Sequence, residues 1–237
     1  MFFIFFQNLS RMPAVKRKRA STKGKGKRSR KSRAPRRIPR ISQAPFPSQK
    51  VAKLRYVENF QVTSPADGLT LALKHFSANS IYDPNRSIGG HQPYGHDQFQ
   101  LLYQHYEVLE AKIKCTFTCG DTDKGPVAST ICAIRMNGSV GVGSPLDEIT
   151  MLESPDVVYG VMTPGTGKLV LNHSFRQKDL YPTTHMGLTA LFGQDPSEQA
   201  FFTLAFGSGS AAAASTDVLL EIEYKCRFFE PKALAMS

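Results

Sequence analysis

Hydrophobic and polar residues alternate along much of the chain beyond about residue 53. The clearest stretch is 216–229, where Leu220, Ile222 and Tyr224 alternate with charged residues. A strand directs successive side chains to opposite faces, so this period of two predicts a strand with one face in a core and one polar face. Eight strands are predicted in this way, near residues 53–63, 68–76, 106–119, 126–138, 157–163, 168–177, 199–207 and 216–229.

Two short stretches have the period of a helix instead. Residues 97–106 are predicted to form one helix, with Asp97 as its N-cap. One face of this helix would carry the i, i+3, i+4 and i+7 positions Phe99, Leu102, Tyr103 and Tyr106. Residues 144–153 are predicted to form the other, with Ser144 as the cap and Pro145 at the first helical position.

The strand count and the long connections predict an all-β fold with two packed antiparallel sheets. Periodicity alone does not choose between a sandwich and a jelly roll. The sequence has no internal repeat of about 20–50 residues, so a repeat architecture is not expected.

Charge is distributed unevenly along the 237 residues. Residues 11–40 hold 15 lysines and arginines, and the first acidic residue is Glu58. From residue 41 onward the other 15 basic residues face 19 acidic ones, so this part has a net charge of −4. A basic segment joined to a mildly acidic body indicates a polyanion partner for the basic segment alone.

The basic arm, residues 12–50, is rich in Lys, Arg, Gly, Ser and Pro, and we expect it to be disordered until it meets nucleic acid. It has no aromatic residue between positions 12 and 45, which favours sequence-indifferent phosphate binding over base stacking. Two runs are typical of nuclear localisation signals, KRKR and KRSRKSR. The residues predicted to bind nucleic acid are Lys16, Arg17, Lys18, Arg19, Lys23, Lys25, Lys27, Arg28, Arg30, Lys31, Arg33, Arg36, Arg37 and Arg40.

Residues 1–11 precede the arm and begin with the apolar run MFFIFF. No stretch of the chain has the roughly 18 apolar residues of a membrane span, so none is predicted. The run also lacks the flanking features of a secretory signal. We interpret residues 1–11 as a short apolar leader, with Met1 and Met12 both open as the first residue of the protein.

The sequence offers few residues for catalysis or metal binding. Zinc ligands must converge at about 2 Å, and the chain has no His-x-His pair, the arrangement expected of a jelly-roll metalloenzyme. We interpret His91 and His96 as hydrogen-bonding loop residues, and we predict no metal, no cofactor and no enzymatic activity. Pro164–Leu169 differs from a phosphate-binding loop because Leu169 stands where Ser or Thr is required, so it is predicted to form a hairpin turn.

The segment from Asn79 to Val108 has a distinctive order of residues. It reads N-S-I-Y-D-P-N, then G-G-H-Q-P-Y-G-H-D-Q, then Y-x-x-Y-x-V. This order closely resembles that in the capsid proteins of circovirus-like CRESS-DNA viruses, which have small circular single-stranded DNA genomes. The resemblance extends over most of the chain, because these proteins also join a basic arm to eight strands.

The resemblance implies a single eight-stranded jelly roll over residues 51–237. It implies a homo-oligomer of about 60 copies in a T=1 icosahedral shell that encloses viral single-stranded DNA. It further implies a virion protein that enters the host nucleus with nuclear import receptors, and that binds a cell-surface receptor of unknown identity.

Within the resembling segment we predict a rigid corner, not a reactive site. Proline presets its own backbone angle and glycine adopts angles that other residues avoid, so both fix turns. The corner would position a loop and a helix for neighbouring subunits. Its predicted members are Asp83, Pro84, Gly90, His91, Gln92, Pro93, Tyr94, Gly95 and Asp97.

Two alternatives stay open at this point. An RNA-virus capsid protein of the same fold would carry a similar arm, because the arm does not distinguish DNA from RNA. A non-viral nucleic-acid-binding protein, such as a ribosomal or chromatin component with a basic tail, would bind nucleic acid without forming a closed shell.

Overall fold

The structure is a computed structural model that describes residues 46–87, 90–119, 129–138, 147–163, 167–180, 186–209 and 212–233. The chain divides into two units, Met1–Ser42 and Gln43–Ser237. The predicted leader and the 14 predicted nucleic-acid-binding residues lie outside the described residues. The helices and strands below all belong to the second unit.

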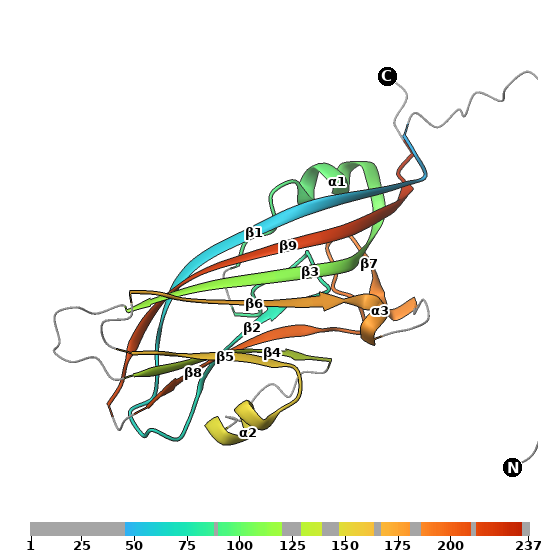
Figure 1. The fold of residues 1–237 in the computed structure, drawn as a ribbon. Helices are drawn as coiled ribbons and strands as arrows, with labels where there is room; N and C mark the ends of the chain where they lie inside the picture. The colour runs from blue at the N-terminus through green and yellow to red at the C-terminus, as the bar shows by residue number, and fades with distance from the viewer. Residues whose placement is uncertain are drawn as a thin grey trace, which may run out of the picture. The chain divides into compact units, whose positions relative to one another are not determined.

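Two antiparallel sheets pack face to face in this unit (Figure 1). The first, named here the β1 sheet, has the order β1 (Gln49–Thr63), β9 (Ser215–Pro231), β3 (Tyr103–Cys119) and β6 (Leu169–Arg176), with β7 (Thr189–Leu191) also paired to β3. The second, the β2 sheet, has the order β2 (Ala72–Ser77), β8 (Phe201–Ser208), β4 (Thr130–Asn137) and β5 (Val157–Met162).

The strand pairs are nested along the chain. β1 pairs with β9, β2 with β8, β3 with β6 and β4 with β5, all antiparallel. The chain therefore crosses between the sheets at most of its connections, which is the arrangement of a jelly roll. The prediction of an all-β, antiparallel jelly roll is confirmed.

All eight predicted strands are present, although their ends shift. β3 begins at Tyr103 and not near 106, and β2 begins at Ala72 and not near 68. Residues 126–128 of the predicted fourth strand lie outside the described residues. β7 is not predicted from the sequence, because three residues are too few to show a period of two.

The first predicted helix is shorter than expected. α1 spans His96–Leu102, and both Tyr103 and Tyr106 belong to β3, where they are buried and paired with β9. The prediction of Asp97 as N-cap is wrong, because Gly95 occupies the cap position with φ +94° and Asp97 lies in the first turn.

The second helix begins later than predicted. α2 spans Glu148–Glu153, and its N-cap is Asp147, not Ser144. The Asp147 carboxylate accepts a hydrogen bond from the Thr150 amide at 2.8 Å, which satisfies a free N–H group of the first turn. Ser144 and Pro145 lie outside the described residues. Two further short helices, α3 (Gln177–Leu180) and η1 (Met186–Leu188), were not predicted.

Residues 164–166 of the predicted hairpin turn at Pro164–Leu169 lie outside the described residues, but the strands on either side of it do not pair as a hairpin. β5 lies at the edge of the β2 sheet, whereas β6 lies at the edge of the β1 sheet. The connection therefore passes from one sheet to the other. Two strands of similar pattern near each other in sequence do not reveal which sheet each one joins.

The core lies between the sheets and is rich in aromatic side chains. Phe228 of β9 is fully buried and stacks on Phe99 of α1, with ring centroids 4.1 Å apart and an interplanar angle of 9°. Phe192 stacks on the same ring from the loop after β7, at 5.8 Å. One strand, one helix and one loop thus meet at Phe228. No helix within the described ranges is long and apolar enough to cross a membrane.

We expect Phe228→Ala to lower the free energy of unfolding by about 3–5 kcal/mol, because it removes buried surface and leaves a cavity beneath α1. Leu219→Ala is the matched control, since Leu219 lies on the same strand, is 42% exposed and should change stability by about 0.5 kcal/mol or less when replaced. Urea unfolding of both variants measures the difference. Equal effects would contradict the central position of Phe228 in the core.

Candidate functional site

The first half of the predicted corner runs back along the edge of β2. The carbonyl of Pro84 accepts a hydrogen bond from the Ser77 amide at 2.7 Å, and the amide of Arg86 donates to the His75 carbonyl at 3.1 Å. The loop therefore covers the free edge of β2 with main-chain bonds. Pro84 is buried.

Asn85 connects this loop to β1. Its side-chain amide donates to Glu58 at 2.7 Å, and its side-chain oxygen accepts from the Ser87 amide at 2.8 Å. Gly90 comes close to the same residue, because a Cβ added at Gly90 would lie 3.0 Å from Asn85 Cβ. A larger residue at position 90 would displace Asn85 or the loop itself.

The second half of the corner turns the chain from the edge of β1 into α1. The Tyr94 amide donates to the Arg55 carbonyl at 3.3 Å, and the His96 amide donates to the Pro93 carbonyl at 3.0 Å. Gly95 follows with φ +94°, an angle that side chains rarely adopt. The imidazole of His91 stacks on Tyr56 of β1 with centroids 4.5 Å apart.

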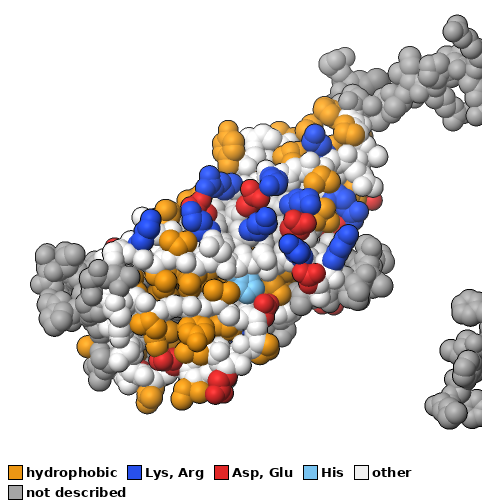
Figure 2. Space-filling model, in the orientation of Figure 1, with side chains coloured by type: hydrophobic (Ala, Val, Ile, Leu, Met, Phe, Trp, Pro, Cys, Tyr) orange, Lys and Arg blue, Asp and Glu red, His pale blue; other side chains and the backbone are white. Residues whose placement is uncertain are grey.

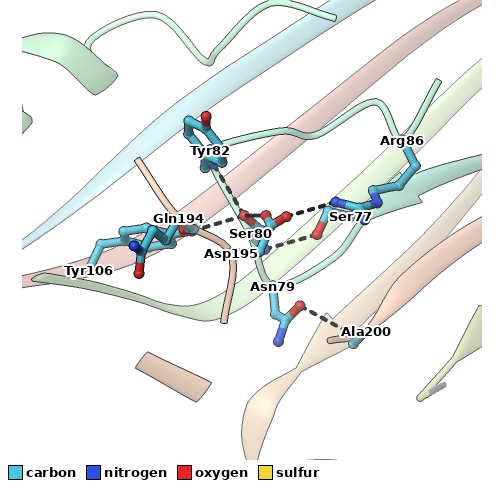
Figure 3. A network of polar contacts seen from close by, with 9 residues as sticks. All are labelled: Ser77, Asn79, Ser80, Tyr82, Arg86, Tyr106, Gln194, Asp195 and Ala200. Atoms are coloured by element: carbon cyan, nitrogen blue, oxygen red, sulfur yellow. Dashed lines mark hydrogen bonds and ion pairs between the residues drawn. The ribbon is translucent and has the colours of Figure 1, made fainter. Parts of the chain in front are cut away.

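A buried polar network joins the corner to the loop before β8 (Figure 3). Ser80 lies at its centre, and its hydroxyl donates to the Asp195 carboxylate at 2.5 Å. The same oxygen lies 2.9 Å from the Tyr106 hydroxyl, which also lies 2.8 Å from the Gln194 carbonyl. Arg86 forms an ion pair with the other Asp195 oxygen at 2.7 Å.

Asn79 and Tyr224 extend this network, and both side chains are buried. The Asn79 side chain donates to the Glu198 carbonyl at 2.6 Å and accepts from the Ala200 amide at 2.9 Å. The Tyr224 hydroxyl donates to the Ser77 carbonyl at 2.6 Å. The two loops and β9 are thus held together through their otherwise unpaired main-chain groups.

The burial and the pKa shifts of the network favour a structural role for its side chains over a catalytic one. Burial raises the pKa of Tyr106, so its hydroxyl stays protonated and continues to donate. Burial also raises the pKa of Asp83, although the nearby Arg86 guanidinium lowers it. Ser80 is fully buried, which leaves its hydroxyl no access to a substrate. Within the described ranges, no cluster of three His, Cys, Asp or Glu side chains could hold a metal.

The structure divides the predicted corner residues into two groups. Asp83, Gly90, His91 and Gln92 line a shallow pocket of about 540 Å³ together with Tyr82 and Arg86. Of the remaining residues, Pro84 lies at the edge of β2, and the others lie along β1 and at the start of α1, where Pro93 is buried and Tyr94 is 92% exposed. Asp97 is also exposed and lies 3.1 Å from the buried His96 ring.

The residues at the centre of the network are not among those predicted from the sequence to form a site. Ser80 lies inside the resembling segment but has no predicted role there. Tyr106 is predicted at the end of a helix and the start of a strand, and Asp195 belongs to no predicted site. One available signal was the Asp195-Pro196 dipeptide, because the same pairing occurs at Asp83-Pro84. Two Asp-Pro turns in connections indicate fixed loops.

Charged side chains cover the outward face of the β1 sheet (Figure 2). They form cross-strand ion pairs, namely Lys53–Glu223, Arg55–Glu221, Lys114–Glu221, Lys225–Glu110 and Arg227–Glu107. Hydrogen bonds from the paired cations lower the pKa values of Glu110, Glu221 and Glu223. These carboxylates are therefore already paired within the sheet.

No protein-family model matches the sequence, and no curated protein matches it. Similar solved structures include Desmodium yellow mottle tymovirus, with a TM-score of 0.45, 13% identity and coverage of 83% of this chain and 98% of that chain. The BFDV capsid protein from its 60-mer has a TM-score of 0.45 and 9% identity, with coverage of 81% and 100%. Turnip yellow mosaic virus has a TM-score of 0.40 and 11% identity, with coverage of 83% and 89%. These neighbours are viral proteins, and likeness at this level says nothing of what this chain binds.

We expect Ser80→Ala to lower the free energy of unfolding by about 1–3 kcal/mol, because the Asp195 carboxylate loses a buried donor and the Tyr82 amide loses its acceptor. Ser197→Ala is the matched control, because Ser197 lies in the partner loop but is exposed. Thermal or urea unfolding measures both variants. If the two serines prove equivalent, the network does not stabilise the corner.

Proposed function

We propose that this chain is a viral capsid protein that assembles into an icosahedral shell and packages circular single-stranded DNA through its basic arm. The observation that carries the proposal is the combination of two parts in one chain. Residues 11–40 hold 15 basic residues, and the unit Gln43–Ser237 forms a jelly roll. Jelly rolls recur in viral capsid domains.

Charge arithmetic supports packaging by the arm. About 60 copies would bring about 900 positive charges to the enclosed genome, which offsets a large part of the phosphate charge of about two thousand nucleotides. The body beyond residue 40 has a net charge of −4 and does not share this excess. The arm is therefore the part of the chain suited to a polyanion.

The corner supports the assembly side of the proposal. Its backbone is fixed by Ser80, Asn85 and Gly95, whereas Tyr82 and Tyr94 on the same segment are 39% and 92% exposed. A rigid loop that presents aromatic side chains is suited to contacts between subunits, since aromatic residues are enriched in interfaces. We propose that the corner positions this loop and α1 against neighbouring copies.

The resemblance in sequence extends the proposal to the life cycle. The runs KRKR and KRSRKSR fit nuclear import receptors, so assembly would take place in the host nucleus and the mature protein would reside in the virion. A cell-surface receptor completes the expected partners. In this function the chain has no enzymatic role.

Electron microscopy and nuclease protection of the full-length chain test the function. We expect uniform closed particles that protect single-stranded DNA and, for the free protein, a slope of log K against log salt of about −10. Replacement of the 14 arm cations by Gln should abolish protection and flatten the slope. Particles that protect RNA alone would favour the RNA-virus capsid, and dispersed protein that binds nucleic acid without particles would favour a ribosomal or chromatin role.

We expect Gly90→Ala to reduce particle yield more than DNA affinity, because the added Cβ meets Asn85 and shifts the corner while the arm is unchanged. Pro93→Ala should act in the same direction by loosening the turn before α1. Gly138→Ala is the control, because a Cβ there meets nothing within 4 Å. Particle counts and DNA titrations would contradict the role of the corner if yield were unchanged.

A further inference from the structure

Within the described residues the two sheets have four edges, formed by β1, by β6 together with β7, by β2 and by β5. An edge strand presents unpaired main-chain donors and acceptors, and these pair with another chain unless the edge is covered or charged. The four edges of this fold differ in how they are protected.

Three edges carry protection of a known kind. The edge of β2 is covered by the Pro84 and Arg86 main-chain bonds of the corner. The edge of β1 carries Lys53 and Arg55, and the Tyr94 amide bonds to it. The edge strand β6 ends in Arg176, which is exposed.

Among the described residues, β5 (Val157–Met162) has none of these forms of protection. Its sequence, VVYGVM, contains no charged residue and no proline. Among the described residues, its main-chain hydrogen bonds within the sheet go to β4. Three of its residues are nevertheless exposed, namely Val158 at 37%, Tyr159 at 56% and Val161 at 49%, whereas Met162 is buried. Val170 of β6 adds a further exposed apolar side chain at 37%. Figure 2 shows hydrophobic side chains gathered beside the charged side chains that cover the outward face of the β1 sheet.

We propose that β5 pairs antiparallel with β5 of a second copy of this chain, which joins the two β2 sheets into one continuous sheet. The inference rests on the proposed capsid function, because it names one contact by which copies assemble. The pairing would lie on a two-fold axis normal to the sheet, since only that axis relates two antiparallel copies of one strand while keeping the faces of the sheet aligned.

The absence of charge on β5 favours a second copy as the occupant. A strand paired with itself brings identical residues near each other, so lysines or arginines on it would repel. Self-pairing of β1 would bring Lys53 and Arg55 toward their own copies, whereas self-pairing of β5 brings together only apolar residues and glycine. The edge without charge is the one that can meet itself without repulsion.

The order of residues in β5 also fits a pairing centred on Gly160. This register places Tyr159 opposite Val161 of the second copy, twice, and aromatic residues pair well with β-branched ones across strands. It places Val158 opposite Met162 of the second copy and leaves only glycines at the centre. A register centred on Tyr159 would instead oppose two bulky rings at one position.

Cysteine cross-linking tests the pairing in the full-length chain. Opposite Cα atoms of antiparallel strands lie about 4.5–5.5 Å apart, which suits a disulfide. Tyr159→Cys and Val161→Cys proteins are mixed and oxidised, both as particles and as unassembled protein. The matched control mixes the Tyr159→Cys protein with a Val170→Cys protein, because Val170 is an exposed valine on β6 of the other sheet. Unsubstituted protein reports any dimer formed through the native cysteines.

We expect a covalent dimer in the mixture of the Tyr159→Cys and Val161→Cys proteins, and none in either variant alone or in the control mixture. Particles that form normally without this dimer would overturn β5 pairing and leave the capsid function standing. A covalent dimer from protein that forms no particles would leave the pairing standing and overturn the closed shell. No particles and no dimer would overturn both.

Discussion

Burial of main-chain polar groups, where the chain crosses between the two sheets, is the constraint on which this fold depends. A jelly roll crosses at most of its connections, and each crossing brings N–H and C=O groups near a dry core where unpaired groups are costly. After β2, the Ser80 hydroxyl accepts from the Tyr82 amide, and the Asn79 side chain donates to the Glu198 carbonyl. Tyr224 of β9 donates to the Ser77 carbonyl. The nested strand order is therefore supported by side-chain hydrogen bonds as well as by apolar packing.

Much of the fold could be predicted from the sequence, since alternation records which face of a strand is buried. The prediction failed where an element has no complete period, as in β7, or where two periods overlap. Tyr103 and Tyr106 fit a helical face, yet pairing with β9 places them in β3. The sheet to which each strand belongs could not be predicted either, because β5 and β6 have similar patterns and join different sheets. Alternation describes one strand and carries no information about its neighbours.

The location of the corner could be predicted from the sequence, but the hydrogen bonds that hold it in position could not. Glycine and proline mark turns locally, so Gly95 and Pro93 could be recognised from sequence. The residues that hold the corner are distant in sequence, because Ser80 and Asp195 are separated by 115 positions. No local pattern links two such residues. Only the pairing of β2 with β8 brings their loops together.

The charged residues fall into two groups, those that form ion pairs on the β1 sheet and the excess of basic residues in the arm. Cross-strand cations already pair with Glu107, Glu110, Glu221 and Glu223 on the outward face of the β1 sheet. These carboxylates are thus not free to neutralise other cations. The body beyond residue 40 offers a net charge of only −4 against 15 basic residues, so the chain as a whole keeps +11. The acidic residues of the chain do not compensate that excess, which is why the charge of the arm predicts an external polyanion partner and the ion pairs of the sheet do not.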